Sequence, residues 1–135
     1  MLVCVTLFFF LVGISVEQEE CIYKTVNGQI DLRTMGNTNG LPKFSNIPDI
    51  NSTDRVTYSY NGCFPINQEG CTNAAICKKD LSSGVLTVIG VQQQKDLPVL
   101  PGVGVTGFLY SGGNNVTVQL FLICNDKEAQ KAQGW

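Results

Sequence analysis

Apolar and polar residues alternate over several short stretches of this chain, which is the pattern of half-buried β-strands. β-Branched and aromatic residues are concentrated in these stretches, and Gly, Asn or Pro residues separate them. The pattern predicts strands over residues 21–26, 29–32, 55–60, 86–91, 106–110 and 116–123. We therefore expect an all-β protein in which short antiparallel strands form packed layers.

Turn residues follow several of the predicted strands. Asn27-Gly28 and Asn61-Gly62 are tight-turn dipeptides, and Ser111-Gly-Gly-Asn114 should join the last two strands as a β-hairpin. Residues 35–53 contain repeated Gly and Pro residues and are predicted to be mostly loop. Residues 116–123 are apolar at nearly every position, which predicts a central strand covered on both faces.

The two ends of the chain do not follow the strand pattern. Residues 1–12 form an apolar run followed by Gly13 and Ser15, which is typical of a secretory signal peptide cleaved after Ser15, although no Lys or Arg precedes the run. The mature chain, residues 16–135, would then be a single β domain. Residues 126–132 have helix-forming composition without an apolar stripe, so we expect a frayed end there.

The composition argues against several classes of function. The chain has no histidine, and its 9 basic and 11 acidic residues form no basic run. We therefore expect no nucleic-acid partner, no metal site and no cofactor. Because the commonest general base is missing, we expect binding rather than catalysis. After the leader, no apolar run is long enough to cross a bilayer, so no membrane span is expected.

Secretion would give two other sequence features a chemical role. Asn51-Ser-Thr53 and Asn115-Val-Thr117 are acceptor sequences for N-glycosylation. Cys4 would leave with the leader, and the remaining five cysteines would enter an oxidising compartment, where spaced cysteines form a disulfide framework. They are Cys21, Cys63, Cys71, Cys77 and Cys124. Because five is odd, one thiol is free, or pairs with another chain, or has its partner outside this chain.

Several segments between the first and the last of these cysteines come in a recognisable order. Cys21 is followed by a strand, a turn and Ile30-Asp-Leu32, and a tyrosine-rich strand, Val56–Tyr60, runs into Asn-Gly-Cys63. Cys71–Cys77, Gly107–Gly113 and an apolar strand that ends at Cys124 come next. Together these segments resemble a mannose 6-phosphate receptor homology domain over nearly the whole mature chain.

The resemblance implies a fold, disulfide pairings and a function. The fold would be a flattened barrel of two antiparallel sheets, with disulfides Cys21–Cys63 and Cys71–Cys77. The function would be carbohydrate recognition in the secretory pathway, in the Golgi or endosome lumen or after secretion, where mannose-type glycans or glycoproteins are bound or sorted. The family's partner for Cys124 lies further C-terminal, so Cys124 would be unpaired and could join chains into a disulfide-linked oligomer.

This sequence departs from the family at the sugar-binding positions. Lys78 stands where mannose-binding members have Gln, and Val116 stands where they have Arg, or Asn114 or Asn115 if the hairpin is shifted. The family's Glu and Tyr would fall beyond Trp135. A lysine only donates hydrogen bonds and a valine side chain forms none, so the resemblance implies a sugar site that is largely missing.

Lys78, Tyr110 and Asn114 remain as candidate ligand-binding residues. A tyrosine ring can stack on a sugar, but aromatic residues at alternating strand positions more often pack in a core. The alternative function is therefore a secreted or lumenal protein-interaction module that kept the fold without the sugar site. A β-sandwich that holds an apolar ligand is disfavoured, because no wide apolar surplus is expected once the core is filled.

Overall fold

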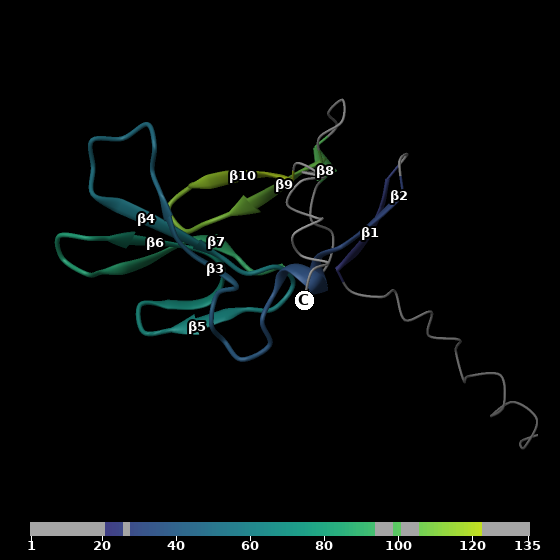
Figure 1. Ribbon diagram of the computed structural model, residues 1–135, viewed down its shortest axis with the longest axis horizontal. Coiled ribbons are helices and arrows are strands. Elements are labelled where there is room, and N and C mark those ends of the chain that lie inside the picture. Colours follow the sequence, from purple (N-terminus) through teal and green to yellow (C-terminus); the bar gives the residue numbers. More distant parts are fainter. Residues whose placement is uncertain (1–20, 26–27, 94–98, 101–105, 123–135) are drawn as a thin grey trace, which may run out of the picture.

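The computed structural model describes residues 21–25, 28–93, 99–100 and 106–122 (Figure 1). The predicted leader, Cys124 and the C-terminal tail lie outside the described residues. The elements are β1 (Ile22–Thr25), β2 (Gly28–Asp31), the 3-10 helix η2 (Leu32–Met35), β3 (Phe44–Pro48), β4 (Val56–Tyr60), β5 (Ile66–Gln68), β6 (Cys71–Asp80), β7 (Leu86–Val91), β8 (Val99–Leu100), β9 (Thr106–Ser111) and β10 (Thr117–Leu122).

The strands form three sheets, and every pairing among them is antiparallel. β1 and β2 pair with each other, β3, β4, β6 and β5 form the larger sheet with β7 on β6, and β10, β9 and β8 form the third sheet. The prediction of an all-β, antiparallel protein is therefore confirmed. As far as the described strands extend, none of these sheets closes into a barrel.

The predicted hairpin at the end of the chain is confirmed, because β9 and β10 pair in continuous register from Ser111 opposite Thr117 to Thr106 opposite Leu122. Strands also occupy the regions predicted near residues 22–31, 55–60 and 86–91. β3 is a strand within the region that was predicted to be loop. Its five residues are all exposed, so it lacks the alternation that would reveal it.

The prediction that residues 116–123 form a central, doubly covered strand is wrong. Within the described part of the chain β10 pairs with β9 alone, and its residues alternate between exposed and half-buried. Phe121 points outward and is 53 % exposed. The apolar run therefore forms a strand with only one covered face, although almost all of its residues are apolar. The central strand is β6, which pairs with β4, β5 and β7.

β6 bends sharply within its own length. Six residues of extended strand span about 20 Å, whereas the Cα atoms of Cys71 and Cys77 are 6.2 Å apart and the two cysteines form a disulfide. Asn73 takes a left-handed φ of 53°, and the register with β7 shifts between Ala74 and Ile76. The first part of β6 therefore pairs with β5, and the part after the bend pairs with β4 and β7.

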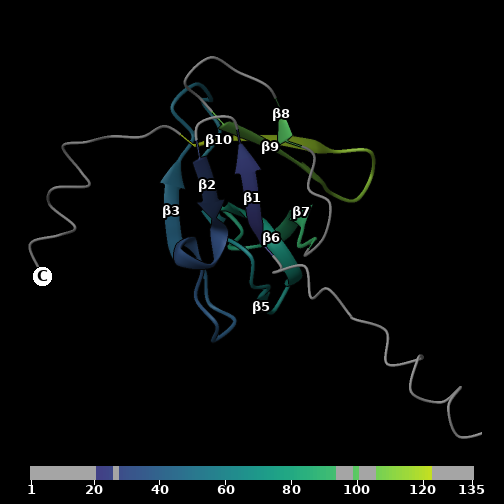
Figure 2. The ribbon, with the colours of Figure 1, turned by 90° about the vertical axis from the view of Figure 1, so that its right-hand side faces the viewer.

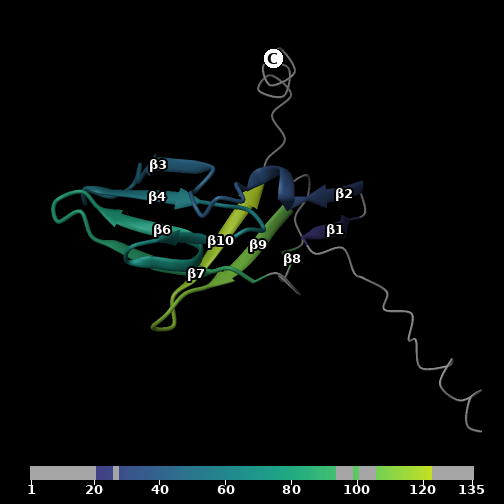
Figure 3. The ribbon, with the colours of Figure 1, turned by 90° about the horizontal axis from the view of Figure 1, so that it is seen from below.

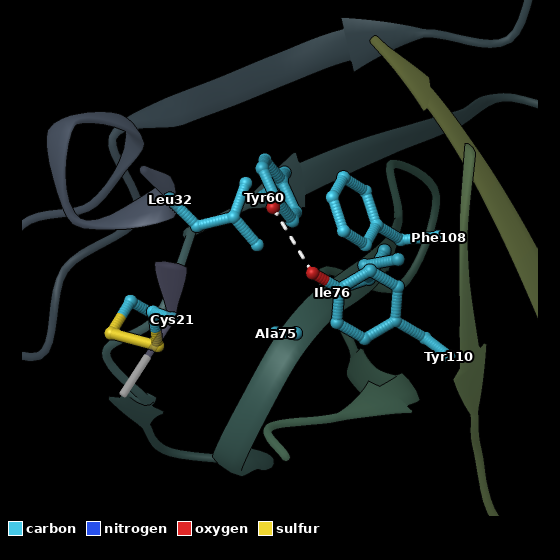
Figure 4. Packing of buried hydrophobic residues seen from close by; sticks show 8 residues of the cluster. Cys21, Leu32, Tyr60, Ala75, Ile76, Phe108 and Tyr110 are labelled. Carbon is cyan, nitrogen blue, oxygen red and sulfur yellow. Dashed lines mark hydrogen bonds between the residues drawn. A yellow bond between two sulfur atoms is a disulfide. The ribbon is translucent and has the colours of Figure 1, made fainter. Parts of the chain in front are cut away.

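The main core lies between the larger sheet and the β9–β10 hairpin, which crosses that sheet (Figures 2 and 3). Its fully buried side chains include Leu32, Phe108 and Tyr110. They meet Tyr60 and Ile76 from the larger sheet, as Figure 4 shows. The ring of Phe108 also lies edge-on to Tyr23 of β1, with ring centroids 5.0 Å apart, so the small sheet closes one end of the core.

A second disulfide, Cys21–Cys63, joins the start of β1 to the segment that follows β4, with Cα atoms 5.6 Å apart. Both cysteines belong to the main core, whereas Cys71 and Cys77 belong to a smaller cluster with Ile66 and Ala74. The two disulfides are the pairings that the family resemblance implies.

The two disulfides should differ in their contribution to stability. Replacing both Cys21 and Cys63 by Ser opens a 42-residue loop and should lower the free energy of unfolding by about 4 kcal/mol. Replacing Cys71 and Cys77 opens a loop of 6 residues and should cost about 2 kcal/mol. Denaturant unfolding of the two double variants measures the difference, and equal losses would contradict the loop-entropy explanation.

Candidate functional site

A groove of about 540 Å³ opens between the larger sheet and the β10 side of the hairpin. Most of its lining is apolar or aromatic, and β3, β4, β6 and β7 of the larger sheet form its floor. β10 and the residue before it form the opposite wall. The lining residues are Ile47, Tyr58, Ser59, Tyr60, Ile76, Lys78, Ile89, Val116, Val118 and Leu120.

Within the described part of the chain, the groove is open because the hairpin covers only part of the larger sheet. Phe108 and Tyr110 of β9 are fully buried, but the inward residues of β10, Val118 and Leu120, are only half-buried. Ile47 of β3 and Val116 are 43 % and 41 % exposed. The groove is therefore an unroofed extension of the core rather than a separate cavity.

Lys78 is the charged side chain among the residues that line this groove. It lies on β6 opposite Tyr58 of β4 and Thr87 of β7, and it is exposed. Its ammonium forms no ion pair with a described residue. Lys79, the next residue of the strand, points to the opposite face of the sheet, so the two lysines do not form a joint anion site.

Tyr58 holds its hydroxyl in a fixed direction at the groove. The hydroxyl donates a hydrogen bond to Asp49 Oδ2 at 3.1 Å, and Asp49 Oδ1 accepts from the amides of Asn51 and Ser52. Partial burial, together with the bond to Asp49, raises the pKa of Tyr58. The hydroxyl is therefore neutral at physiological pH and is already engaged, which leaves the ring as the surface offered to a ligand.

Tyr110 does not contact the groove. Its side chain is fully buried, and its hydroxyl shares a hydrogen bond of 3.1 Å with Tyr60, drawn as a dashed line in Figure 4. Burial raises the pKa of Tyr110 well above the usual range, and it also raises the pKa of Tyr60. Tyr110 is a core residue that carries a satisfied polar group, and a ligand cannot reach it in this structure.

The remaining candidate, Asn114, lies at the exposed tip of the β9–β10 turn with a left-handed φ of 57°. It is absent from the groove lining, so the structure does not bring Lys78, Tyr110 and Asn114 together. It does bring together Lys78 and Val116, which the expected family resemblance would align with two sugar-binding positions. Among the described residues, those positions therefore meet in an apolar groove rather than in a polar site.

Sequence reasoning missed most of the groove. Ile47 lies in the region predicted to be loop, and Ile89, Val118 and Leu120 lie in predicted strands, but a periodic pattern does not tell which apolar side chains a second layer will leave uncovered. The structure also corrects the argument that no apolar surplus remains after core filling. The only early signal was the unusually apolar last strand.

Both predicted glycosylation sites are exposed. Asn51 lies in the turn that Asp49 organises between β3 and β4, and Asn115 lies in the hairpin turn with a left-handed φ of 60°. N-glycosylation requires an accessible asparagine, and both sites meet that condition.

Within the described ranges, no group of three or more His, Cys, Asp or Glu residues is placed to hold a metal ion. No helix among those residues is long and apolar enough to cross a membrane. Comparison of the chain with protein-family models, curated proteins and solved structures finds no match.

The Tyr60–Tyr110 pair should behave as a structural hydrogen bond. Tyr110→Phe leaves the buried hydroxyl of Tyr60 without its partner, which should lower the free energy of unfolding by about 1–3 kcal/mol. Tyr58→Phe is the matched control, because its hydroxyl is only partly buried and its loss should cost about 0.5–1.5 kcal/mol. Denaturant unfolding compares the two, and a larger loss for Tyr58→Phe would contradict this assignment.

Proposed function

We propose that this chain is a non-catalytic recognition module of the secretory pathway, of the mannose 6-phosphate receptor homology type, that binds glycoproteins through their polypeptide rather than their mannose. The observation that carries the proposal is the chemistry of the groove at Lys78 and Val116. A groove lined by apolar and aromatic side chains with one cation suits apolar side chains of a partner better than a polyhydroxylated sugar.

Hydrogen-bond capacity gives the strongest argument against a sugar ligand. Mannose recognition needs several donors and acceptors held in fixed directions around the hydroxyl groups. In this groove the hydroxyls of Tyr58 and Tyr60 already bond to Asp49 and Tyr110, which leaves the Lys78 ammonium and the Ser59 hydroxyl. A sugar that lost its water here would leave most of its hydroxyls unpaired, and each one costs about 1–3 kcal/mol.

Support for the secretory pathway comes from the disulfides. Two intrachain disulfides whose four cysteines are all buried are typical of proteins that fold in an oxidising compartment. The apolar N-terminal run and the two exposed glycosylation sequences agree with that environment. The Golgi or endosome lumen, or the extracellular space, is therefore the proposed location.

Carbohydrate recognition is the second candidate, and one observation favours it. Lys78 and Val116, which the resemblance aligns with sugar-contacting residues, line the same groove even though they lie 38 residues apart in the sequence. That placement is expected if the groove descends from a mannose site. The side chains now present favour loss of sugar binding over its retention.

The proposal predicts weak sugar binding. Mannose and mannose 6-phosphate should bind this chain no tighter than millimolar, which is about −4 kcal/mol. Calorimetric titration with both sugars and a glycan array measure this directly. Micromolar affinity for either sugar, lost in the Lys78→Ala variant, would overturn the polypeptide-binding proposal in favour of the carbohydrate-recognition one.

A second prediction concerns Cys124, which follows β10 by two residues and lies outside the described residues. Since the other four mature cysteines are paired, we expect Cys124 to form an intermolecular disulfide in an oxidising lumen. Non-reducing electrophoresis should show a dimer or larger species that disappears with reductant and in Cys124→Ser. A monomer whose Cys124 thiol reacts with iodoacetamide would contradict this prediction.

A further inference from the structure

Among the described strands, the layer that covers the larger sheet ends at β10. Figure 3 shows the β9–β10 hairpin crossing β6 and β7, with β10 on the side toward the part of the sheet that remains uncovered. The groove lies on that side, because its upper wall consists of Val116, Val118 and Leu120 and includes no residue of β9. The position next to β10, over Ile47 and Tyr58, is therefore where another strand would complete the second layer.

The backbone of β10 presents hydrogen-bonding groups to that position. Gly112 N donates to Val116 O at 2.7 Å, which shows that the backbone groups of Val116 point toward β9. Because backbone groups of successive strand residues point to alternate sides, those of Thr117, Gln119 and Phe121 point away from β9. No described strand pairs with this edge of β10.

The edge of β10 lacks the features that normally prevent strand addition. Its six residues, Thr117–Leu122, include no proline and no charge, and their register with β9 is unbroken. The outer edge of β3 is a contrast within the same protein. There Pro48 ends the strand, Asn46 has a left-handed φ of 55°, and the register shifts between Phe44 and Ile47.

We infer that the edge of β10 and the adjoining groove together bind an extended segment of a partner polypeptide, which adds to β10 as a strand and places alternate apolar side chains in the groove. In such β-strand addition the main chain supplies affinity and pockets for alternate side chains supply specificity. The inference rests on the proposed function, since it names the partner's chemistry and the surface that receives it.

The charge at the groove refines the chemistry of the partner. Lys78 lies among apolar lining residues and has no ion pair with a described residue, so a bound segment would cover its ammonium. An acidic side chain among the inward-facing positions of the segment would offset that burial, because an unpaired charge is costly to desolvate. The expected ligand is therefore an extended peptide with alternating apolar residues and one Asp or Glu.

Two other occupants fit the surface less well. A second copy that paired β10 with β10 would bring its own larger sheet into the space beneath the joined strands, which the β3–β4 part of the first copy already occupies. The residues that follow β10 do not suit the groove either. Residues 125–135 are mostly polar, and Trp135 is the one large apolar side chain among them.

Synthetic peptides test the inference on the full mature chain carrying Cys124→Ser, which prevents disulfide exchange. The probe is a fluorescent peptide of about eight residues in which Val alternates with Thr and one inward Val is replaced by Glu. Three control peptides each differ from the probe in one way. The first has the same residues in scrambled order, the second has N-methyl groups on the amides that would face β10, and the third has Lys in place of Glu. Fluorescence anisotropy should show binding of the probe and at least about tenfold weaker binding of all three controls.

Two pairs of protein variants separate the edge from the groove. Gln119→Pro removes an amide that points away from β9 and leaves the ladder with β9 intact, whereas Gln119→Thr keeps the amide. Val116→Asp places a charge in the groove, whereas Val85→Asp makes the same change at an exposed position between β6 and β7 that does not line the groove. The first member of each pair should weaken probe binding about tenfold or more, and the second should leave it within about twofold.

Amide hydrogen exchange distinguishes strand addition from a ligand that only fills the groove, because such a ligand would not protect the outward amides of β10. The bound probe should slow exchange at the amides of Gln119 and Phe121, and decanoate, an amphipathic anion, should not. Binding of the N-methylated peptide as tight as the probe, or unchanged affinity in Gln119→Pro, would overturn strand addition. Strand addition would also be overturned if no alternating peptide bound at millimolar concentration. It would likewise be overturned if decanoate displaced the probe and the bound probe had not protected the amides of Gln119 and Phe121.

The outcomes also distinguish this inference from the function on which it rests. Peptide binding that ignores both Gln119→Pro and Val116→Asp would leave a polypeptide-binding module whose site lies elsewhere. Micromolar mannose binding without peptide binding would instead reject the proposed function itself. If Gln119→Pro unfolds, which thermal unfolding would show, the N-methylated peptide still tests the backbone contact on the unaltered protein.

Discussion

The buried side chain of Asn61 is the interaction on which the rest of the structure depends. Its Oδ1 accepts from the amides of Asn37 and Lys43 at 2.8 and 3.1 Å, and its Nδ2 donates to the carbonyls of Asn37 and Phe64 at 3.0 and 2.8 Å. Its own amide donates to Ala75 O in β6. A fully satisfied buried amide of this kind favours one arrangement of the segments it joins, because any other arrangement leaves several polar groups unpaired.

The residues around Asn61 extend this constraint to the Cys21–Cys63 disulfide. Gln92, after β7, donates from its side chain to the carbonyls of Asn61 and Phe64. The neighbouring Gly62 lies against the backbone at Leu32, where a Cβ atom would come within 2.6 Å of the carbonyl oxygen. Cys63 then fastens the segment to β1, so one end of the molecule is held by buried hydrogen bonds, a close backbone contact and a covalent link.

How much of this could be predicted from the sequence depends on whether a feature is local. The all-β class and the β9–β10 hairpin follow from alternation and turn residues, and the disulfide pairings followed from the order of segments that resemble a known family. The Asn61 network could not be predicted, because an Asn-Gly dipeptide equally describes an exposed turn. β6 was missed because its buried residues are mostly Ala and Cys, and the groove was missed because coverage by another layer is a property of the whole fold.

The stability supplied by the part of the protein around Asn61 accounts for how the other part can keep an open groove. An uncovered apolar groove and an unprotected strand edge cost stability and invite aggregation, so a small domain tolerates them only if other interactions hold the fold. Here the Tyr60–Tyr110 bond and the Cys21–Cys63 disulfide lie in the main core, the Asn61 network adjoins Cys63, and the Cys71–Cys77 disulfide fixes the bend of β6. Among the described residues, the half of the sheet that carries Tyr58 and Lys78 therefore remains without a second layer, and the proposed binding of an extended partner there would not include the entropic cost of ordering this surface first.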